Sequence, residues 1–165
     1  MFPEMRRKKQ QLSPEETEEI LRRGSHGVLA LLGNEGWPYA LPISYVYMDG
    51  KLYFHCAAAG HKLEALAREP RASFCVVDRD EVVPELFTSA YSSAIAFGRI
   101  RMLEDSGEIL RALVALCGKY SPGIDPAEEL KKSSAGVRVL EMSIERLSGK
   151  EGMEMLRRRN SDGQA

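Results

Sequence analysis

The segment FHCAAAGHKLEAL, from Phe54 to Leu66, joins the end of an apolar strand to a loop of small residues and the start of a helix. Gly60, His61 and Lys62 stand where that helix would begin. A helix N-terminus presents unpaired N–H groups and a partial positive charge. Glycine lets an anion approach the backbone and lysine adds a full charge, so the segment favours a phosphate cradle. A lysine in a first helical turn is more often simply solvated, and the residue types leave both interpretations open.

His55 is the second candidate for chemistry. By strand alternation it shares a face with Tyr53 and Ala57, as either a core histidine bonded to a carbonyl or a group that faces a ligand. Ser92 and Ser93 interrupt an apolar strand, where hydroxyls either face water or border a polar ligand. No Gly-x-Ser-x-Gly motif surrounds them, which argues against a nucleophilic serine. The histidines lack the spacing of metal ligands, so we expect no metal site.

The composition limits the classes of function. The chain has 165 residues, of which 23 are basic and 24 acidic, and a net charge of −1 argues against a general nucleic-acid-binding protein. No apolar run approaches the roughly 18 residues of a membrane span, and the start lacks the apolar core of a signal peptide. We therefore expect a cytoplasmic protein with no membrane partner. Cys56, Cys75 and Cys117 are expected to be reduced thiols, because their number is odd and their spacing wide.

The length and the charge distribution predict one domain between two charged ends. Residues 1–12 are basic and polar, so we expect a flexible arm. Its RRKK run at 6–9 is either solvated, the more common case, or in contact with a polyanion. Residues 13–152 are expected to form the domain, and residues 153–165 a charged C-terminal tail.

Helix signals stand at four places in the chain. Ser13 and Glu16 form a capping box, and Gly24 could end that first helix in a left-handed conformation. The helices expected on these signals and on apolar periodicity lie within 13–24, 60–69, 106–122 and 126–134.

Strand signals fill most of the remaining chain. Residues 27–57 predict three strands joined by the turns GNEG and DG. Pro38 and Pro42 cannot donate ladder hydrogen bonds, so the strand at 37–48 is either irregular or has a free edge. Gly98 indicates a bulge or a close approach in a later strand, and residues 81–89 are expected to be an irregular loop or a short excursion. About six antiparallel strands with helices around them suggest a small barrel, in a mainly β fold.

Three segments together resemble a known family. They are EGWPYALPISYVYMDGKLYFHCAAAGHKLEALAREPRASFCVV, YSSAIAFGRIRML and SIERLSGKEG. They resemble the flavin-binding core of the pyridoxamine 5′-phosphate oxidase-like superfamily, and within it most closely the 5-nitroimidazole-resistance proteins. The resemblance runs from about Gly24 to Gly152, and the stretch from YFH to GxK is its most specific part.

The resemblance implies a split β-barrel that binds FMN at the interface of a homodimer. By position, Lys62 and the backbone of Gly60 and His61 would hold the phosphate, and Ser93 would approach the ring. The residues implied to contact the cofactor are Leu41, Pro42, Ile43, Ser44, His55, Cys56, Ala57, Gly60, His61, Lys62, Ser93, Ser148, Gly149 and Lys150, the last three from the same or the partner protomer.

The resemblance also implies an activity. It favours an FMN-dependent oxidoreductase, of nitroreductase or flavin-reductase type, that passes electrons to a small aromatic or nitro acceptor, with His55 as a general acid. A non-catalytic protein that binds flavin, deazaflavin or haem is the alternative.

His61 stands where the pyridoxamine phosphate oxidases have arginine, which weakens the expected phosphate clamp because imidazole is largely neutral near pH 7. Their arginine-rich product signature is absent, so vitamin B6 oxidation is not expected. Leu147 replaces a tryptophan of some relatives and would leave the substrate pocket more open.

Overall fold

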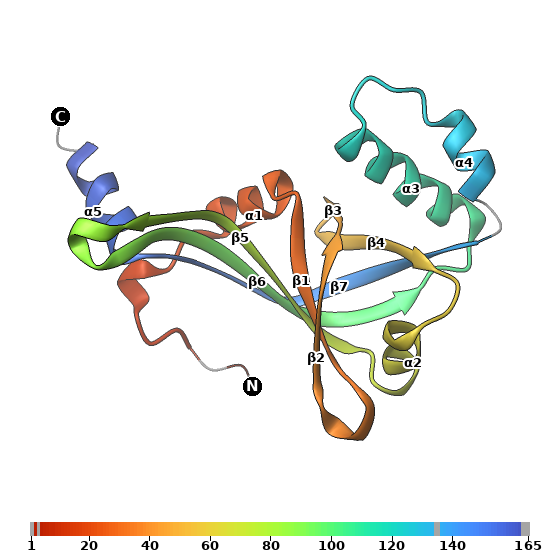
Figure 1. The fold of residues 1–165 in the computed structure, drawn as a ribbon, viewed down its shortest axis with the longest axis horizontal. Helices are drawn as coiled ribbons and strands as arrows, with labels where there is room; N and C mark the ends of the chain where they lie inside the picture. The colour runs from red at the N-terminus through yellow and green to blue at the C-terminus, as the bar shows by residue number, and fades with distance from the viewer. Residues whose placement is uncertain (1, 3, 134–135, 163–165) are drawn as a thin grey trace.

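A single antiparallel sheet forms the frame of the protein (Figure 1). The computed structural model describes residues 2, 4–133 and 136–162. Within them the sheet has seven strands in the order β2-β1-β5-β6-β7-β4-β3. The strands are β1 (His26–Leu32), β2 (Pro38–Ser44), β3 (Val46–Met48), β4 (Lys51–Ala57), β5 (Arg71–Val83), β6 (Thr88–Met102) and β7 (Val137–Glu151).

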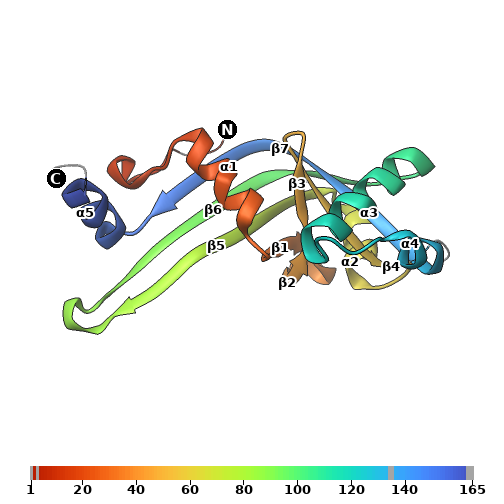
Figure 2. The ribbon, with the colours of Figure 1, turned by 90° about the horizontal axis from the view of Figure 1, so that it is seen from above.

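The prediction of about six strands is wrong, because the expected strand at 37–48 is broken at Tyr45 into β2 and β3. β2 is an edge strand, so Pro38 and Pro42 need no partner on their free side. The expected loop at 81–89 is also wrong. β5 and β6 pair as far as Val83 and Thr88, and the 3₁₀ turn η3 (Pro84–Leu86) joins them. Figure 2 shows the resulting long hairpin projecting from the body.

Five α-helices border the sheet in the described residues: α1 (Pro14–Arg23), α2 (His61–Arg68), α3 (Ser106–Tyr120), α4 (Ala127–Ser133) and α5 (Met153–Asp162). Two further 3₁₀ turns are η1 (Lys8–Gln10) and η2 (Asn34–Gly36). The capping box of Ser13 and Glu16 is present. Of the expected helix at 126–134, residue 134 lies outside the described residues. No helix among the described residues is long and apolar enough to cross a bilayer.

Gly24 does end α1, but not in the left-handed conformation expected, since its φ is −59°. The glycine is explained instead by the lack of space for a side chain at this position. A Cβ at this position would lie 2.6 Å from Cγ1 of Val76 and 2.7 Å from Oη of Tyr45. Gly98 behaves as expected: the register shifts beside it, and a Cβ there would lie 2.0 Å from the carbonyl oxygen of Ser143.

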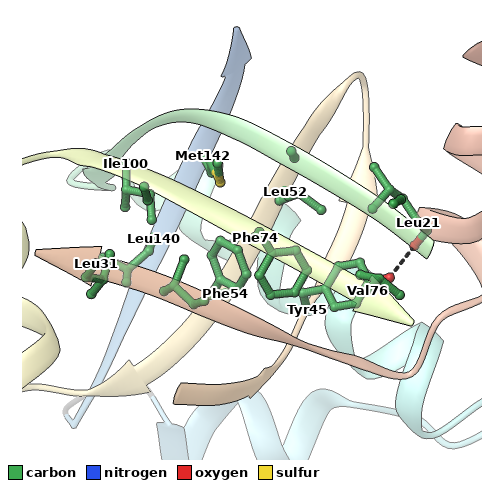
Figure 3. Packing of buried hydrophobic residues seen from close by; sticks show 14 of the residues in the cluster. Leu21, Leu31, Tyr45, Leu52, Phe54, Phe74, Val76, Ile100, Leu140 and Met142 are labelled. Atoms are coloured by element: carbon green, nitrogen blue, oxygen red, sulfur yellow. Dashed lines mark hydrogen bonds between the residues drawn. The ribbon is translucent and has the colours of Figure 1, made fainter. Parts of the chain in front are cut away.

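The two edge strands of the sheet, β2 and β3, follow each other in the chain, so the sheet must curl to bring its two edges close together. β2 and β3 are separated by Tyr45 alone, and no hydrogen-bonded ladder joins them. The Tyr45 side chain is fully buried and its hydroxyl donates to the carbonyl of Leu21 at 2.8 Å (Figure 3). The Tyr45 N–H donates to Oη of Tyr120 at 2.8 Å. That hydroxyl in turn lies 2.5 Å from the carbonyl oxygen of Ser25 and 2.9 Å from that of Tyr45.

The core fills the inside of the curl. Phe74 packs edge-on against Tyr45, with ring centroids 4.8 Å apart, and against Phe54 at 5.2 Å. Aromatic pairs of this geometry stabilise a core beyond the area they bury. The other labelled side chains of Figure 3 belong to the same cluster and are Leu21, Leu31, Leu52, Val76, Ile100, Leu140 and Met142.

The molecule has two distinct ends (Figure 1). The curled end contains β2, β3, β4 and α2. The hairpin end contains the β5–β6 tip, the last residues of β7 and α5. The segment expected as a charged tail forms α5 up to Asp162, and Arg158 pairs with Glu81 of the hairpin at 2.8 Å. Residues 163–165 of that segment, and positions 1 and 3 of the arm, lie outside the described residues.

We predict that Tyr120→Phe destabilises the fold, because the Tyr45 N–H then loses its acceptor at the junction of the two edge strands. Leaving a buried donor unsatisfied costs about 1–3 kcal/mol. Urea titration measures the loss in free energy of unfolding. Tyr39→Phe is the control, since no hydrogen bond of its hydroxyl is present among the described residues. Equal stability of Tyr120→Phe and the wild type would contradict this role for Tyr120.

Candidate functional site

The loop before α2 has the geometry of an open anion cradle. Ala58, Ala59 and Gly60 are exposed, and Gly60 is the N-cap of α2 with φ 133°. That backbone conformation suits glycine, and no described atom lies within 4 Å of where a Cβ would be. No described group accepts from the N–H of His61 or Lys62. These free donors, with no side chain over them, fit a phosphate-sized anion.

His61 and Lys62 differ in what they contact. The His61 ring stacks on Tyr39 of β2, with centroids 4.3 Å apart and an interplanar angle of 17°. Lys62 is half-buried and has no ion pair among the described residues. Burial raises the pKa of the nearby Cys56 thiol, and the charge of Lys62 opposes that shift. Lys62 is thus the free cation beside the cradle, while His61 is held against β2. Tyr39 was not predicted, although its position in a strand after a turn could have suggested it.

β4 places His55 and Ala57 on the surface and Cys56 in the core. His55 and Ala57 are exposed, whereas Cys56 is 8% exposed and belongs to the core cluster. The alternative of a core histidine is therefore excluded. The Cys56 side chain points to the core face of β4, opposite to that of His55. Only the backbone of Cys56 could therefore contact a ligand on the face that His55 occupies.

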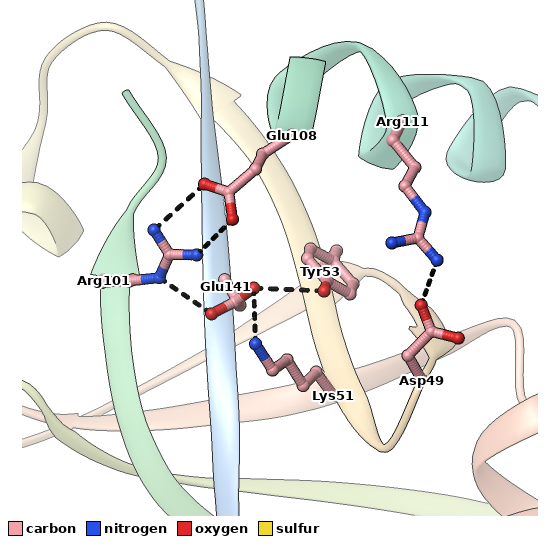
Figure 4. Close-up of polar contacts among 7 residues, drawn as sticks. All are labelled: Asp49, Lys51, Tyr53, Arg101, Glu108, Arg111 and Glu141. Atoms are coloured by element: carbon pink, nitrogen blue, oxygen red, sulfur yellow. Dashed lines mark hydrogen bonds and ion pairs between the residues drawn. The ribbon is translucent and has the colours of Figure 1, made fainter. Parts of the chain in front are cut away.

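A network of charges ties β4 to β6, β7 and α3 (Figure 4). Glu141 of β7 is 3% exposed and accepts from Arg101 at 2.8 Å, from Lys51 at 3.1 Å and from Tyr53 at 3.1 Å. Arg101 also pairs with Glu108 of α3 at 2.8 Å. Burial raises the pKa of Glu141, but its three hydrogen bonds outweigh burial and hold the pKa below 4.5. Burial and Glu141 together raise the pKa of the Tyr53 phenol to about 12. The network ties α3 to three strands.

The four predicted residues of β2 alternate between the two faces of the sheet. Leu41 and Ile43 pack against the core, so their side chains cannot line a ligand on the outer face. Pro42 is exposed and Ser44 is half-buried on that outer face. Side-chain contacts from β2 to a cofactor could therefore come from Pro42 and Ser44 only.

The remaining predicted residues lie at the hairpin end. Ser93 of β6 pairs with Lys150 of β7, and Ser148 pairs with Ile95. Ser93, Ser148 and Lys150 are half-buried. Gly149 is buried, and a Cβ there would lie 2.1 Å from Oγ1 of Thr17, so it serves the packing of α1.

One protomer does not bring all of the predicted residues together. His55 pairs with Val139, and Lys150 lies eleven positions further along β7. At the rise of a β-strand this separation is about 35 Å along β7. The residues of α2 and β4 therefore form a group at the curled end, and Ser93, Ser148 and Lys150 form a second group at the hairpin end.

An uncovered apolar surface lies between the two groups. Val28, Cys75 and Ile95 are neighbours across β1, β5 and β6, and the row continues to Pro42 on one side and Ser148 on the other. The row spans four strand spacings, about 19 Å. We call Val28, Cys75, Val77 and Ile95 the outer patch; Val28 is 42%, Val77 58% and Ile95 36% exposed. The strand alternation in these segments could have revealed it.

Comparison with known proteins places the chain in a family. The model of the pyridoxamine 5′-phosphate oxidase family matches residues 13–151, and the chain belongs to that family. No curated protein matches the chain. The resemblance inferred from the sequence is thereby confirmed.

Several solved structures share the fold. A protein from Bacteroides thetaiotaomicron assigned to 5-nitroimidazole antibiotic resistance is 22% identical, with a TM-score of 0.72 over 86% of each chain. A FAD-binding protein from Mesorhizobium loti is 27% identical, with a TM-score of 0.65 over 86% of this chain and 96% of that one. The FAD and haem binding protein from Mycobacterium smegmatis is 26% identical, with a TM-score of 0.74 over 88% of this chain and 74% of that one.

We predict that Glu141→Gln destabilises the protein at neutral pH by about 1–3 kcal/mol, because Arg101 and Lys51 lose the buried negative charge and one of its two acceptor oxygens. The folded pKa of Glu141 is lowered, so its contribution is full above pH 4.5 and is lost as the pH falls through that lowered value. Unfolding titrations between pH 7 and pH 3 should show the wild type and variant converging below pH 4.5. Glu145→Gln, in an exposed pair with Arg99, is the control and should change little. A difference that stays constant to pH 3 would contradict the assignment.

Proposed function

We propose that this protein is a homodimeric flavoprotein that holds FMN between the curled end of one protomer and the hairpin end of the other. The observation that carries the proposal is the open cradle at Gly60 with the free Lys62 beside it. Family membership and the FAD-binding relatives at 26–27% identity support a flavin as the ligand. Residues 13–152 would form the split-barrel flavin-binding domain.

The residues at the curled end divide the binding between them. Lys62 and the free N–H groups of α2 would hold the phosphate through charge-assisted hydrogen bonds. Residues 57–60 are small and exposed, so they leave room for the ribityl chain of FMN against the backbone. Pro42 and Ser44 would border the ring on the outer face of β2. His61 would support β2 through Tyr39 rather than contact the phosphate with its ring.

The reaction we propose is the reduction of a small aromatic or nitro compound. A bound flavin supplies one- and two-electron chemistry. His55 is exposed on the same strand as Ala57, so it could hold a proton near the ring and deliver it to the acceptor as a general acid. The buried network at Glu141 keeps β4, and therefore His55, in a fixed position relative to the rest of the sheet.

The separation of the two residue groups supports a dimer. Two sheets can face each other across their outer patches about a two-fold axis that runs across the strands. This arrangement places the hairpin end of one protomer over the curled end of its partner, and the partner's Ser93, Ser148 and Lys150 would complete each site. It would also cover the exposed apolar side chains of both outer patches, as a stable interface requires.

A non-catalytic role is the second candidate. The Mycobacterium smegmatis relative binds FAD and haem, and an exposed histidine such as His55 could contact a ligand without transferring a proton. Bound flavin can be reduced chemically and then mixed with a nitroimidazole or another nitroaromatic compound. If the compound does not speed the reoxidation of the tightly bound flavin, the result would favour this carrier or sensor function.

The first test is flavin uptake. Purified protein incubated with FMN should show bound flavin absorbance, and Lys62→Ala should lower FMN affinity about tenfold to a hundredfold, as expected for one charge-assisted hydrogen bond. Arg68→Ala, at the other end of α2, is the control and should leave FMN affinity unchanged. Protein that stays colourless with FMN would refute the proposal. An unchanged FMN affinity in Lys62→Ala would mean that Lys62 is a solvated surface residue and does not contact the phosphate.

The second test is the interface. Ile95→Lys places a charge in the outer patch and should convert the dimer into monomers that bind FMN at least tenfold more weakly, because a buried unpaired charge costs several kcal/mol. Light scattering coupled to size exclusion measures the mass. Ile124→Lys, at an apolar residue that is 69% exposed beyond α3, is the control and should remain dimeric. Monomeric wild-type protein with full FMN affinity would contradict the shared site.

A further inference from the structure

The tip of the β5–β6 hairpin exposes three apolar side chains to water. Val82 is 69%, Leu86 50% and Phe87 98% exposed, and we call these three residues the apolar tip. Phe87 has a left-handed backbone, with φ 49° and ψ 42°, which a residue with a large side chain rarely adopts. Its N–H donates to the carbonyl of Pro84 at 3.1 Å, so the turn η3 fixes this conformation. A strained residue that holds an aromatic ring in water points to a function for that ring.

The hairpin that carries the apolar tip is braced by α5. Arg158 of α5 donates two hydrogen bonds to the Glu81 carboxylate, at 2.8 and 3.2 Å. Just before α5, the N–H of Gly152 donates to the carbonyl of Tyr91 at 2.7 Å. The hairpin projects from the body in this braced position (Figure 2). A loop that is ordered in advance loses little conformational entropy when it binds a partner.

The apolar tip continues the outer patch along the same face of the sheet. Val82 pairs with Ser89, and Ser89 lies on the same face of β6 as Ile95. The outer patch alone is small for an interface, because its three most exposed side chains are only between 36% and 58% exposed. A stable dimer buries about 800 Å² on each partner, and one aromatic side chain can bury about 150–250 Å². A dimer formed across the outer patch therefore needs further apolar surface, which the two tips have.

The two-fold axis proposed for the dimer brings each tip to the far end of the partner's β6. Phe87 lies eight positions before Ile95 in the chain, and Met102 lies seven positions after it. At the rise of a β-strand these separations are about 26 Å and about 23 Å, on opposite sides of the outer patch. Rotation about an axis that crosses the strands at Ile95 exchanges the two directions along the sheet. The tip of one copy thus reaches the end of β6 in the other.

An apolar hollow lies at that end of β6. It has a volume of about 330 Å³, and its apolar lining consists of Met102, Leu103, Ile109, Val137 and Val139. Met102 is 46% exposed, and Ile109 and Val137 are partly exposed, so an incoming side chain can contact them. A methionine sulfur at the edge of an aromatic ring makes a favourable contact. The hollow is therefore suited to the Phe87 ring.

The charges beside the hollow and beside the tip are complementary at one position each. Arg138 and Glu104 complete the lining of the hollow, and Glu85 is the exposed acidic residue of the turn before Phe87. Within the part of the chain that the structure describes, neither Arg138 nor Glu85 has an ion pair or a side-chain hydrogen bond. When the ring enters the hollow, Glu85 would meet Arg138.

We propose that the apolar tip of each protomer docks into the hollow at the end of β6 of a second copy of this chain, with the Phe87 ring in the hollow and Glu85 beside Arg138. The inference rests on the proposed homodimer, and it gives that dimer an anchor outside the flavin contacts. The two-fold symmetry repeats the contact, so each dimer contains it twice. Aromatic anchors in hollows of this kind carry much of the binding free energy of an interface.

Sedimentation equilibrium of the wild type and of Phe87→Ser measures what the anchor contributes. The side chain is 98% exposed in one chain, so the variant should fold normally. The dissociation constant of its dimer should rise at least tenfold. Ile124→Ser removes an apolar side chain that is 69% exposed outside the proposed contact, and this control should dimerise as the wild type does. An unchanged dissociation constant in Phe87→Ser overturns the docking of the tip and leaves the proposed flavin site standing. A wild type that is monomeric at every concentration overturns both the homodimer and the docking.

Cross-linking between two different chains locates the tip. One chain carries Phe87→Cys and the other Met102→Cys, both with Cys75→Ser and Cys117→Ser, so that the buried Cys56 is the one remaining native thiol. A short bismaleimide added to the mixed dimers should join the two chains. The same reagent should not join Phe87→Cys to a chain that carries Ile124→Cys. Cross-linking of neither pair, or of both pairs alike, would show that the tip does not dock at the end of β6.

Discussion

Tyr45 joins the two edges of the sheet, and the position of every candidate residue depends on that junction. β2 and β3 have no ladder between them, so the curl is held by the core and by the hydrogen bonds of one residue. Tyr120 brings the end of α3 to the same point, and Leu21 brings α1. Burial raises the pKa of the Tyr45 phenol far above its ordinary value, so it stays a neutral donor.

The curl has a direct consequence for function. It places the α2 cradle beside β2, where Tyr39 stacks on His61, and it turns the opposite face of β1, β5 and β6 outward. That face remains apolar, with candidate cofactor residues along both of its sides. One protomer therefore has two incomplete sets of contacts and an uncovered surface between them. A second copy is the simplest partner that would cover the surface and complete both sets.

Much of the local structure could be predicted from the sequence because its causes are local. The capping box of α1 and the helix after Gly60 each follow from residues close together in the chain. The most specific part of the family resemblance, from YFH to GxK, is one continuous stretch for the same reason.

The remaining features depend on contacts between distant residues. The break at Tyr45 depends on hydrogen bonds to Leu21 and Tyr120, and no local pattern indicates it. The attachment of residues 10–12 to the last residues of β7 depends on the free edge of that strand, which exists only because β4 ends its pairing at Ser143. The family pattern implies cofactor contacts for Leu41 and Ile43, whereas strand alternation turns their side chains into the core. Position in a motif does not show which face a side chain occupies.

The most direct test of the shared site is a heterodimer of two damaged chains. One chain carries Lys62→Ala, the other carries Ser93→Ala and Lys150→Ala, and two different affinity tags allow the mixed dimer to be isolated. If each site takes one group from each protomer, the mixed dimer has one intact site and one doubly damaged site. We predict one FMN bound per dimer with wild-type affinity, although both parent homodimers bind weakly. Two weak sites and no tight site in the mixed dimer would show that each site lies within a single chain, and would contradict the account.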